Sequence, residues 1–80
     1  MRLKTGDFKL TQEIAKRLCS LRVEAGITQT LAAEFAGESL SAYRSHEGGL
    51  TSPTIFALRK YAEVFRVSTD YLLGLTDRKM

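Results

Sequence analysis

The chain has 80 residues, 44% of them hydrophobic and 26% charged, a composition typical of one small folded domain and not of a disordered segment. Twelve Lys and Arg against nine Asp and Glu give a net charge of +3, which favours a polyanionic partner without requiring one. No run approaches the roughly 20 apolar residues of a membrane span, and residues 1–7 lack the apolar stretch of a signal peptide. We therefore expect a cytoplasmic protein with no membrane partner.

The residues that usually carry chemistry are few. Cys19 is the only cysteine, which excludes an internal disulfide and a Cys-based metal site, and its apolar surroundings predict a buried, inert thiol. His46 is the only histidine and is expected to be packed against the domain. No Ser/His/Asp arrangement and no glycine-rich phosphate loop is present. The sequence therefore predicts no enzyme: no catalytic residues, no metal site and no cofactor.

The N-terminal part of the chain predicts a short arm followed by a helix. Residues 1–10 are partly basic without periodicity, which indicates a flexible N-terminal arm. Thr11 is predicted to cap a helix that Gly26 ends. Between these two residues, apolar side chains recur at the spacing of one helix face, at Ile14, Leu18, Leu21 and Ala25.

Two short helices joined by a tight turn are predicted next. Thr28 is expected to cap the first, and Gly37 to end it. One face of that helix is predicted to be apolar, formed by Leu31, Ala32, Phe35 and Ala36. Ser39 is expected to cap the second helix, which the pair of glycines at 48 and 49 must terminate. This is the plan of a helix-turn-helix, whose second helix enters the DNA major groove.

The remaining chain predicts two more helices and a tail. Ser52 and Pro53 indicate the start of a fourth helix, with Ser as the cap and Pro at the first helical position. Its apolar positions are Ile55, Leu58, Ala62 and Phe65, with Tyr61 alongside. A last short helix is expected from Ser68 to Gly74, and residues 76–80 are expected to form a frayed tail. Because no strand pattern occurs, we predict an all-α, five-helix domain over residues 11–75.

The third predicted helix has an outer face suited to reading DNA. Stepping about 100° per residue from Leu40 places Leu40, Ser41, Arg44, Ser45 and Gly48 in one arc. Arg44 could form a bidentate contact with guanine, Ser41 and Ser45 could donate or accept hydrogen bonds, and Leu40 could meet a thymine methyl. Tyr43 and His46 fall on the opposite, inner side. A solvated helix face would look much the same, so this face alone leaves both interpretations open.

Phosphate contacts are predicted at two places. Thr28 and Gln29 stand at a helix start, where backbone N–H groups and the helix dipole favour an anion. Thr51 and Ser52 could form a second contact after the paired glycines. A plain capping turn remains the alternative at the first place, and the second has few basic residues nearby.

The stretch from Leu18 to Asp77, about three quarters of the chain, resembles the phage-repressor and Cro-like (XRE) helix-turn-helix family. The resemblance is carried by segments in the family's order and spacing: Leu21–Gln29, Ala33-Glu34, Gly37, Ser39, Tyr43–Gly49, Ser52-Pro53 and Tyr61–Gly74. Taken singly these segments are unspecific, whereas their order and spacing together are specific. The resemblance implies a compact, lambda-repressor-like DNA-binding domain.

The resemblance also implies roles for individual residues. Gln29 would contact a phosphate, the loop after the paired glycines would follow the DNA backbone, and Arg22 and Glu47 would form an ion pair between the first and third helices. Base readout would come from Leu40, Ser41, Arg44 and Ser45. Ala32 and Glu38 replace apolar residues common in the family, and Phe35 is expected to fill the volume that Ala32 leaves.

The sequence thus predicts a repressor-like transcriptional regulator that binds specific double-stranded DNA, as a homodimer. A C-terminal apolar stripe is expected to be mostly core, and an exposed part of it could form the dimer contact; its members are Tyr61, Phe65, Tyr71, Leu72 and Leu73. The alternative is an antitoxin or regulatory module on the same fold, whose partner is a toxin or another regulator.

Overall fold

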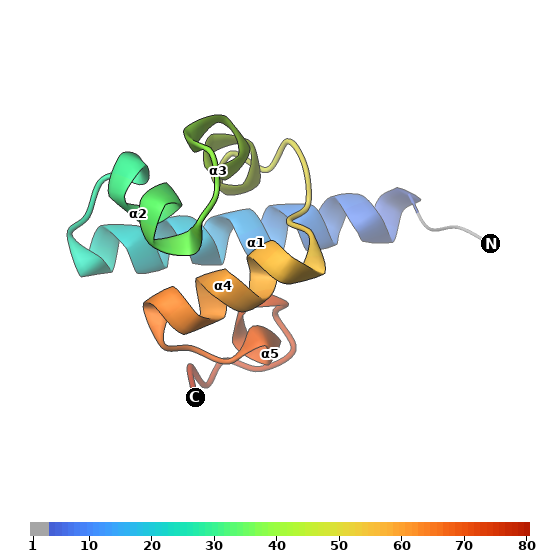
Figure 1. Cartoon of the computed structure of the whole chain (residues 1–80). Helices are drawn as coiled ribbons and strands as arrows, with labels where there is room; N and C mark the ends of the chain where they lie inside the picture. Colours follow the sequence, from blue (N-terminus) through green and yellow to red (C-terminus); the bar gives the residue numbers. More distant parts are fainter. Residues whose placement is uncertain (1–3) are drawn as a thin grey trace.

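The computed structural model describes residues 4–80, with side chains described for residues 8–80. This part of the chain contains five α-helices. They are α1 (Lys4–Ala25), α2 (Gln29–Ala36), α3 (Leu40–Glu47), α4 (Ile55–Phe65) and α5 (Thr69–Leu72). α1 runs the length of the domain, with α2 and α3 along one side of it and α4 and α5 along the other (Figure 1). Within residues 4–80 there is no strand, and no helix is long and apolar enough to cross a membrane. The predicted all-α, five-helix fold is confirmed.

The first helix begins earlier than predicted. It starts at Lys4, so a non-helical arm over residues 4–10 and a cap at Thr11 are wrong, while residues 1–3 lie outside the described part. The added turns project beyond the other helices (Figure 1), and Phe8 within them is 66% exposed. Phe8, Lys9 and Leu10 in these turns are all exposed, so they do not continue the buried stripe of α1. Propagating a helix that is already nucleated costs little per residue, and Lys and Leu are good helix formers.

Side-chain caps begin four of the helices. The hydroxyls of Thr28, Ser39 and Ser68 each accept a hydrogen bond from a backbone N–H three residues on, at 3.0–3.1 Å. The caps predicted at Thr28 and Ser39 are confirmed. The fourth cap differs: Thr54, not Ser52, caps α4. Ser52 instead pairs its hydroxyl with that of Thr11 on α1. A long-range contact therefore holds this residue outside the helix.

Gly37 makes the turn between α2 and α3. It ends α2 in the left-handed region at φ 70°, which a residue without Cβ adopts at no steric cost. Its N–H donates to the Glu34 carbonyl, and the N–H of Glu38 donates to the Ala33 carbonyl. These two bonds satisfy the last carbonyls of α2 and send the chain directly into α3.

The core is built around four fully buried side chains, Leu18, Tyr43, Tyr61 and Leu72. α2 contributes only small residues to it, Ala32, Ala33 and Ala36. Phe35 is 56% exposed and does not fill the space beside Ala32, so that prediction is wrong. The alanine face lets α2 lie close to α3 and α4, which leaves no volume for a phenyl ring there.

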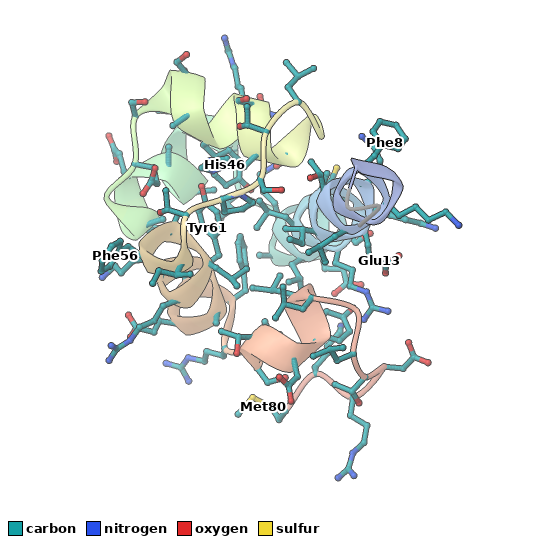
Figure 2. The ribbon with its side chains drawn as sticks, turned by 90° about the vertical axis from the view of Figure 1, so that its right-hand side faces the viewer. Phe8, Glu13, His46, Phe56, Tyr61 and Met80 are labelled. Carbon is teal, nitrogen blue, oxygen red and sulfur yellow. The ribbon has the colours of Figure 1, made fainter. Side chains whose placement is uncertain are left out.

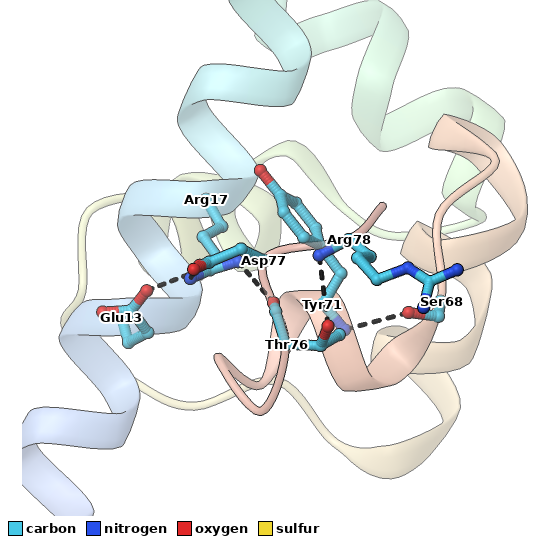
Figure 3. A network of polar contacts seen from close by, with 7 residues as sticks. All are labelled: Glu13, Arg17, Ser68, Tyr71, Thr76, Asp77 and Arg78. Carbon is cyan, nitrogen blue, oxygen red and sulfur yellow. Dashed lines mark hydrogen bonds and ion pairs between the residues drawn. The ribbon is translucent and has the colours of Figure 1, made fainter. Parts of the chain in front are cut away.

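The C-terminal residues are docked, not frayed. Arg17 on α1 donates to the Thr76 carbonyl at 3.0 Å and to the Asp77 carboxylate at 3.1 Å, pairs with Glu13, and stacks on the Tyr71 ring (Figure 3). The Lys79 carbonyl also accepts a 2.7 Å bond from the Ser68 N–H. The prediction of a frayed tail over residues 76–80 is therefore wrong, because a single partly buried guanidinium can hold several tail groups at once.

The candidate dimer stripe is mostly interior. Tyr61 and Leu72 are fully buried, and the other three members are half-buried. The expectation that most of this stripe is core is therefore confirmed, and a dimer contact through its half-buried members stays a prediction. The large apolar side chains exposed on α2 and α4 are Leu31, Phe35, Ile55 and Phe56.

Candidate nucleic-acid interface

The outer face of α3 is open to solvent and lined by short side chains. Ser41 and Arg44 are exposed, while Leu40 and Ser45 are half-buried at its edges. These four residues, together with Leu50 from the following loop, line one shallow groove. The helical-wheel placement of the four predicted readers on one outward face is thus what the structure contains.

The inner face of α3 is anchored to α4 by aromatic rings. Tyr43 packs edge-to-face on Tyr61 with ring centroids 5.5 Å apart. His46 Nδ1 lies 2.7 Å from the Tyr61 hydroxyl, and the two side chains point toward one another in the interior (Figure 2). The His46–Tyr61 contact gives the polar atoms of both buried side chains a partner, and the Tyr43–Tyr61 contact is a packing of ring edge on ring face. They fix the rotation of α3 about its own axis.

An ion pair anchors α3 to α1. Arg22 donates from Nε to Oε1 of Glu47 at 2.8 Å and from Nη2 to Oε2 at 3.0 Å, a bidentate arrangement. Its Nη1 also donates to the Ile27 carbonyl at 2.9 Å, which ties down the chain before α2. The Glu47 side chain is only 6% exposed. The ion pair implied by the family resemblance is therefore present.

The charge on Glu47 is stabilised by its neighbours. Burial alone would raise the pKa of this carboxyl, but Arg22, the nearby Tyr43 hydroxyl and Gln29 outweigh it and lower the pKa. The Tyr43 hydroxyl is buried and makes no hydrogen bond of good geometry. Burial and the Glu47 charge raise the pKa of that phenol, so it stays neutral. The cluster is thus one buried anion held by one cation.

Gln29 belongs to this cluster as well as to the start of α2. Its side-chain Nε2 donates to Glu47 Oε2 at 3.1 Å, a contact that the sequence analysis did not foresee. An amide nitrogen carries two N–H groups, so one remains for another acceptor. Thr28, its neighbour, uses its hydroxyl for capping. One N–H group of the Gln29 amide is therefore bound by Glu47, and this bond holds the side chain in place.

The loop after α3 is tied to α1. Gln12 Nε2 donates to the Gly49 carbonyl at 3.0 Å, and a Cβ added at Gly49, whose φ is 76°, would lie 2.6 Å from that same nitrogen. Thr51 pairs its hydroxyl with that of Ser45 at 2.8 Å. The predicted phosphate residues Thr51 and Ser52 are exposed but each already has a protein partner. Sequence reasoning missed Gln12 because no local pattern marks it.

A family model described as Helix-turn-helix (HTH_3) matches residues 18–72, more than half of the chain. The chain belongs to the helix-turn-helix family. This is the Cro and phage-repressor-like (XRE-type) group, so the resemblance noted in the sequence is confirmed. The domain is thus of a DNA-binding, regulatory type. No curated protein and no solved structure gives a significant match.

Other candidate sites in this helix-turn-helix protein carry no comparable arrangement. Cys19 is half-buried instead of buried, and burial raises the pKa of its thiol, which disfavours the reactive thiolate. Among the described residues, no three His, Cys, Asp or Glu side chains gather as metal ligands would. Of the candidate sites considered in the described residues, α3 with the helices that anchor it is therefore the best supported.

The anchor between α3 and α4 predicts a pH dependence of stability. Burial lowers the pKa of His46 below its ordinary 6.5, and the negative charge of Glu38 opposes this only in part. As the pH falls through about 6.5, His46 of the unfolded chain takes up a proton that His46 of the folded chain does not yet bind. The free energy of unfolding is therefore highest above that pH and falls as the pH drops toward the pKa of His46 in the folded chain. We expect the urea midpoint of unfolding to decline from about pH 7.5 to 5.

His46→Gln provides the control, because Gln does not titrate and can still bond the Tyr61 hydroxyl. Its urea midpoint should be lower than that of the native chain at pH 7.5 but flatter across the same range. An equally steep decline in His46→Gln would show that another group is responsible.

Proposed function

We propose that this protein is a repressor-like transcriptional regulator that binds specific sites in double-stranded DNA with α3 in the major groove. The observation that carries the proposal is the outward face of α3, which presents short side chains and one Arg while its other sides are anchored. An α-helix with its side chains is about 10–12 Å in diameter, which matches the roughly 12 Å width of the major groove. Short side chains allow the helix to approach the base edges.

Each predicted reader has a chemical role in this proposal. Arg44 is exposed and takes no part in the contacts described above that anchor α3. Its guanidinium can therefore form a bidentate pair with guanine. Ser41 can donate or accept, and Leu40 offers an apolar edge to a thymine methyl. Ser45 shares its hydroxyl with Thr51 and keeps one hydrogen-bonding function for a base. Readout would thus rest on one strong contact and several weak ones.

Phosphate contacts would position this face. The first N–H groups of α2 have no partner within the helix and point along its axis. The second N–H of Gln29 can join them, since the bond to Glu47 holds the amide at this end of α2. Thr28, Thr51 and Ser52 would add hydroxyl or backbone contacts on either side. Because these groups are neutral, they orient the protein more than they add salt-dependent affinity.

We further propose that the protein binds as a homodimer and acts without catalysis or cofactor. Two copies related by a two-fold axis would read half-sites about 10 base pairs apart. The rival proposal, an antitoxin or regulatory module that grips a toxin or another protein, draws on the exposed Phe35, Ile55 and Phe56. Both proposals fit the same fold. They differ in whether the protein selects specific DNA sites or binds another protein.

The test is selection from a random-sequence duplex pool, followed by titration of the selected site across a salt series. We expect a short palindromic site, with log affinity falling against log salt at roughly −0.9 per phosphate neutralised by a Lys or Arg side chain. Failure to enrich any site, together with salt-insensitive binding, would contradict the regulator proposal and leave the protein-binding module. A single non-palindromic half-site would contradict the dimer alone.

A further inference from the structure

Leu50 is an apolar side chain displayed on the face that the proposed function places against DNA. It is 80% exposed, and it lines the same groove as Leu40, Ser41, Arg44 and Ser45. It follows the last turn of α3, whereas Leu40 stands in the first turn. The groove therefore has an apolar side chain near each end of α3.

The backbone around Leu50 is held by contacts that do not involve its side chain. The Leu50 N–H donates to the Ser45 carbonyl at 3.0 Å, and the Thr51 N–H donates to the same carbonyl at 3.4 Å. Gln12 binds the Gly49 carbonyl from α1, and the Ser45–Thr51 hydroxyl pair closes the other side. The loop thus presents Leu50 to solvent from a fixed backbone, which is not how a protein hides a large apolar residue.

The chemistry of Leu50 selects its partner within duplex DNA. A leucine side chain has no hydrogen-bond donor for a phosphate. Packing it against phosphate oxygens would remove water from their negative charge without replacing the lost hydrogen bonds. In the major groove the only apolar group on a base edge is the C5-methyl of thymine. With α3 docked in the major groove as proposed, Leu50 would lie beside base edges, because it lines the same groove as the four predicted readers.

We propose that Leu50 reads thymine at the edge of each half-site by packing on its C5-methyl group. The proposal rests on the proposed DNA-binding function and adds a specificity-determining residue to it. It gives the protein a contact that is independent of salt, next to a reading face with a single cation. Removing the methyl group should cost about three- to fivefold in affinity per half-site, as burial of one CH₂-sized group does.

The experiment uses the full chain and the site selected from a random-sequence pool by the wild type. Each thymine of that site is replaced in turn by uracil, which removes only the methyl group. Binding of the wild type, Leu50→Ala and Leu50→Lys is measured on every duplex. Ile55→Ala is the matched control, because Ile55 is 76% exposed but lies outside the groove. Thermal unfolding of each variant confirms that exposed positions were changed without loss of fold.

The proposal expects one thymine per half-site whose replacement weakens wild-type binding three- to fivefold. Leu50→Ala should bind the unmodified site as weakly as the wild type binds the uracil site, and should not distinguish the two. Leu50→Lys should also lose this discrimination while steepening the salt dependence, whereas Ile55→Ala should behave as the wild type does.

Three results would overturn the proposal while leaving the DNA-binding function intact. Leu50→Ala could keep the full thymine preference, or lose the same affinity on thymine and uracil duplexes, which would indicate a sugar contact. It could instead lose only the cooperativity between half-sites, which would make Leu50 a contact between two copies. If the wild type selects no site at all, the proposed function fails, and this inference fails with it.

Discussion

Glu47→Ala is expected to lower the free energy of unfolding by about 2–4 kcal/mol, slightly less than for a fully buried pair because Arg22 keeps some solvent contact. The substitution leaves the Arg22 guanidinium, 18% exposed, without the carboxylate that satisfies two of its N–H groups. It also removes the acceptor of Gln29. For a domain of this size such a loss is a large part of the total stability, which typically scales at about 0.05–0.15 kcal/mol per residue.

Urea unfolding at neutral pH measures this effect. Glu63→Ala is the matched control, since Glu63 pairs with Arg59 on the surface of α4 and its loss should cost less than about 1 kcal/mol. The double variant Arg22→Met/Glu47→Met should recover much of the loss, because no buried charge is then unpaired. A cost for Glu47→Ala as small as that for Glu63→Ala would contradict a buried, structural role for the pair.

Arg44→Ala is expected to weaken binding to the selected DNA site by about 1–3 kcal/mol and to relax the preference at one base position. The reason is that Arg44 is exposed at the centre of the α3 face and is its only cation. Competition binding against a set of single-base variants of the site measures both effects. The free energy of unfolding should stay nearly unchanged, because the Arg44 side chain takes no part in the contacts described above that anchor α3.

Arg44→Lys separates base readout from simple charge. Lysine keeps the charge but cannot form the same planar, bidentate pair with guanine. We expect it to retain the salt dependence of the wild type and to lose most of the base preference. An equal loss of affinity on all sequences for Arg44→Ala would mean that Arg44 contacts phosphate and that the readers lie elsewhere.

Much of the candidate site followed from local rules. Counting about 100° per residue along α3 was enough to separate the outward Ser41 and Arg44 from the inward Tyr43 and His46. Hydroxyl residues three positions before a free N–H marked the starts of α2, α3 and α5. What local rules did not supply was the second partner of each polar group. Gln29 was predicted to contact a phosphate from its place at a helix start, and no local rule indicated the bond of its amide to Glu47.

The sequence by itself determined that there are five helices, the caps of α2 and α3 and the outward face of α3, because these depend on residues within about one turn of each other. Only the tertiary structure decided that Lys4 begins α1, that Phe35 faces solvent and that the C-terminal residues dock. It also decided how the loop that carries Leu50 is held. Gln12 and Gly49 are 37 positions apart, and Arg17 and Asp77 are 60 apart. Contacts over such separations arise from how whole helices pack, and no local pattern encodes them.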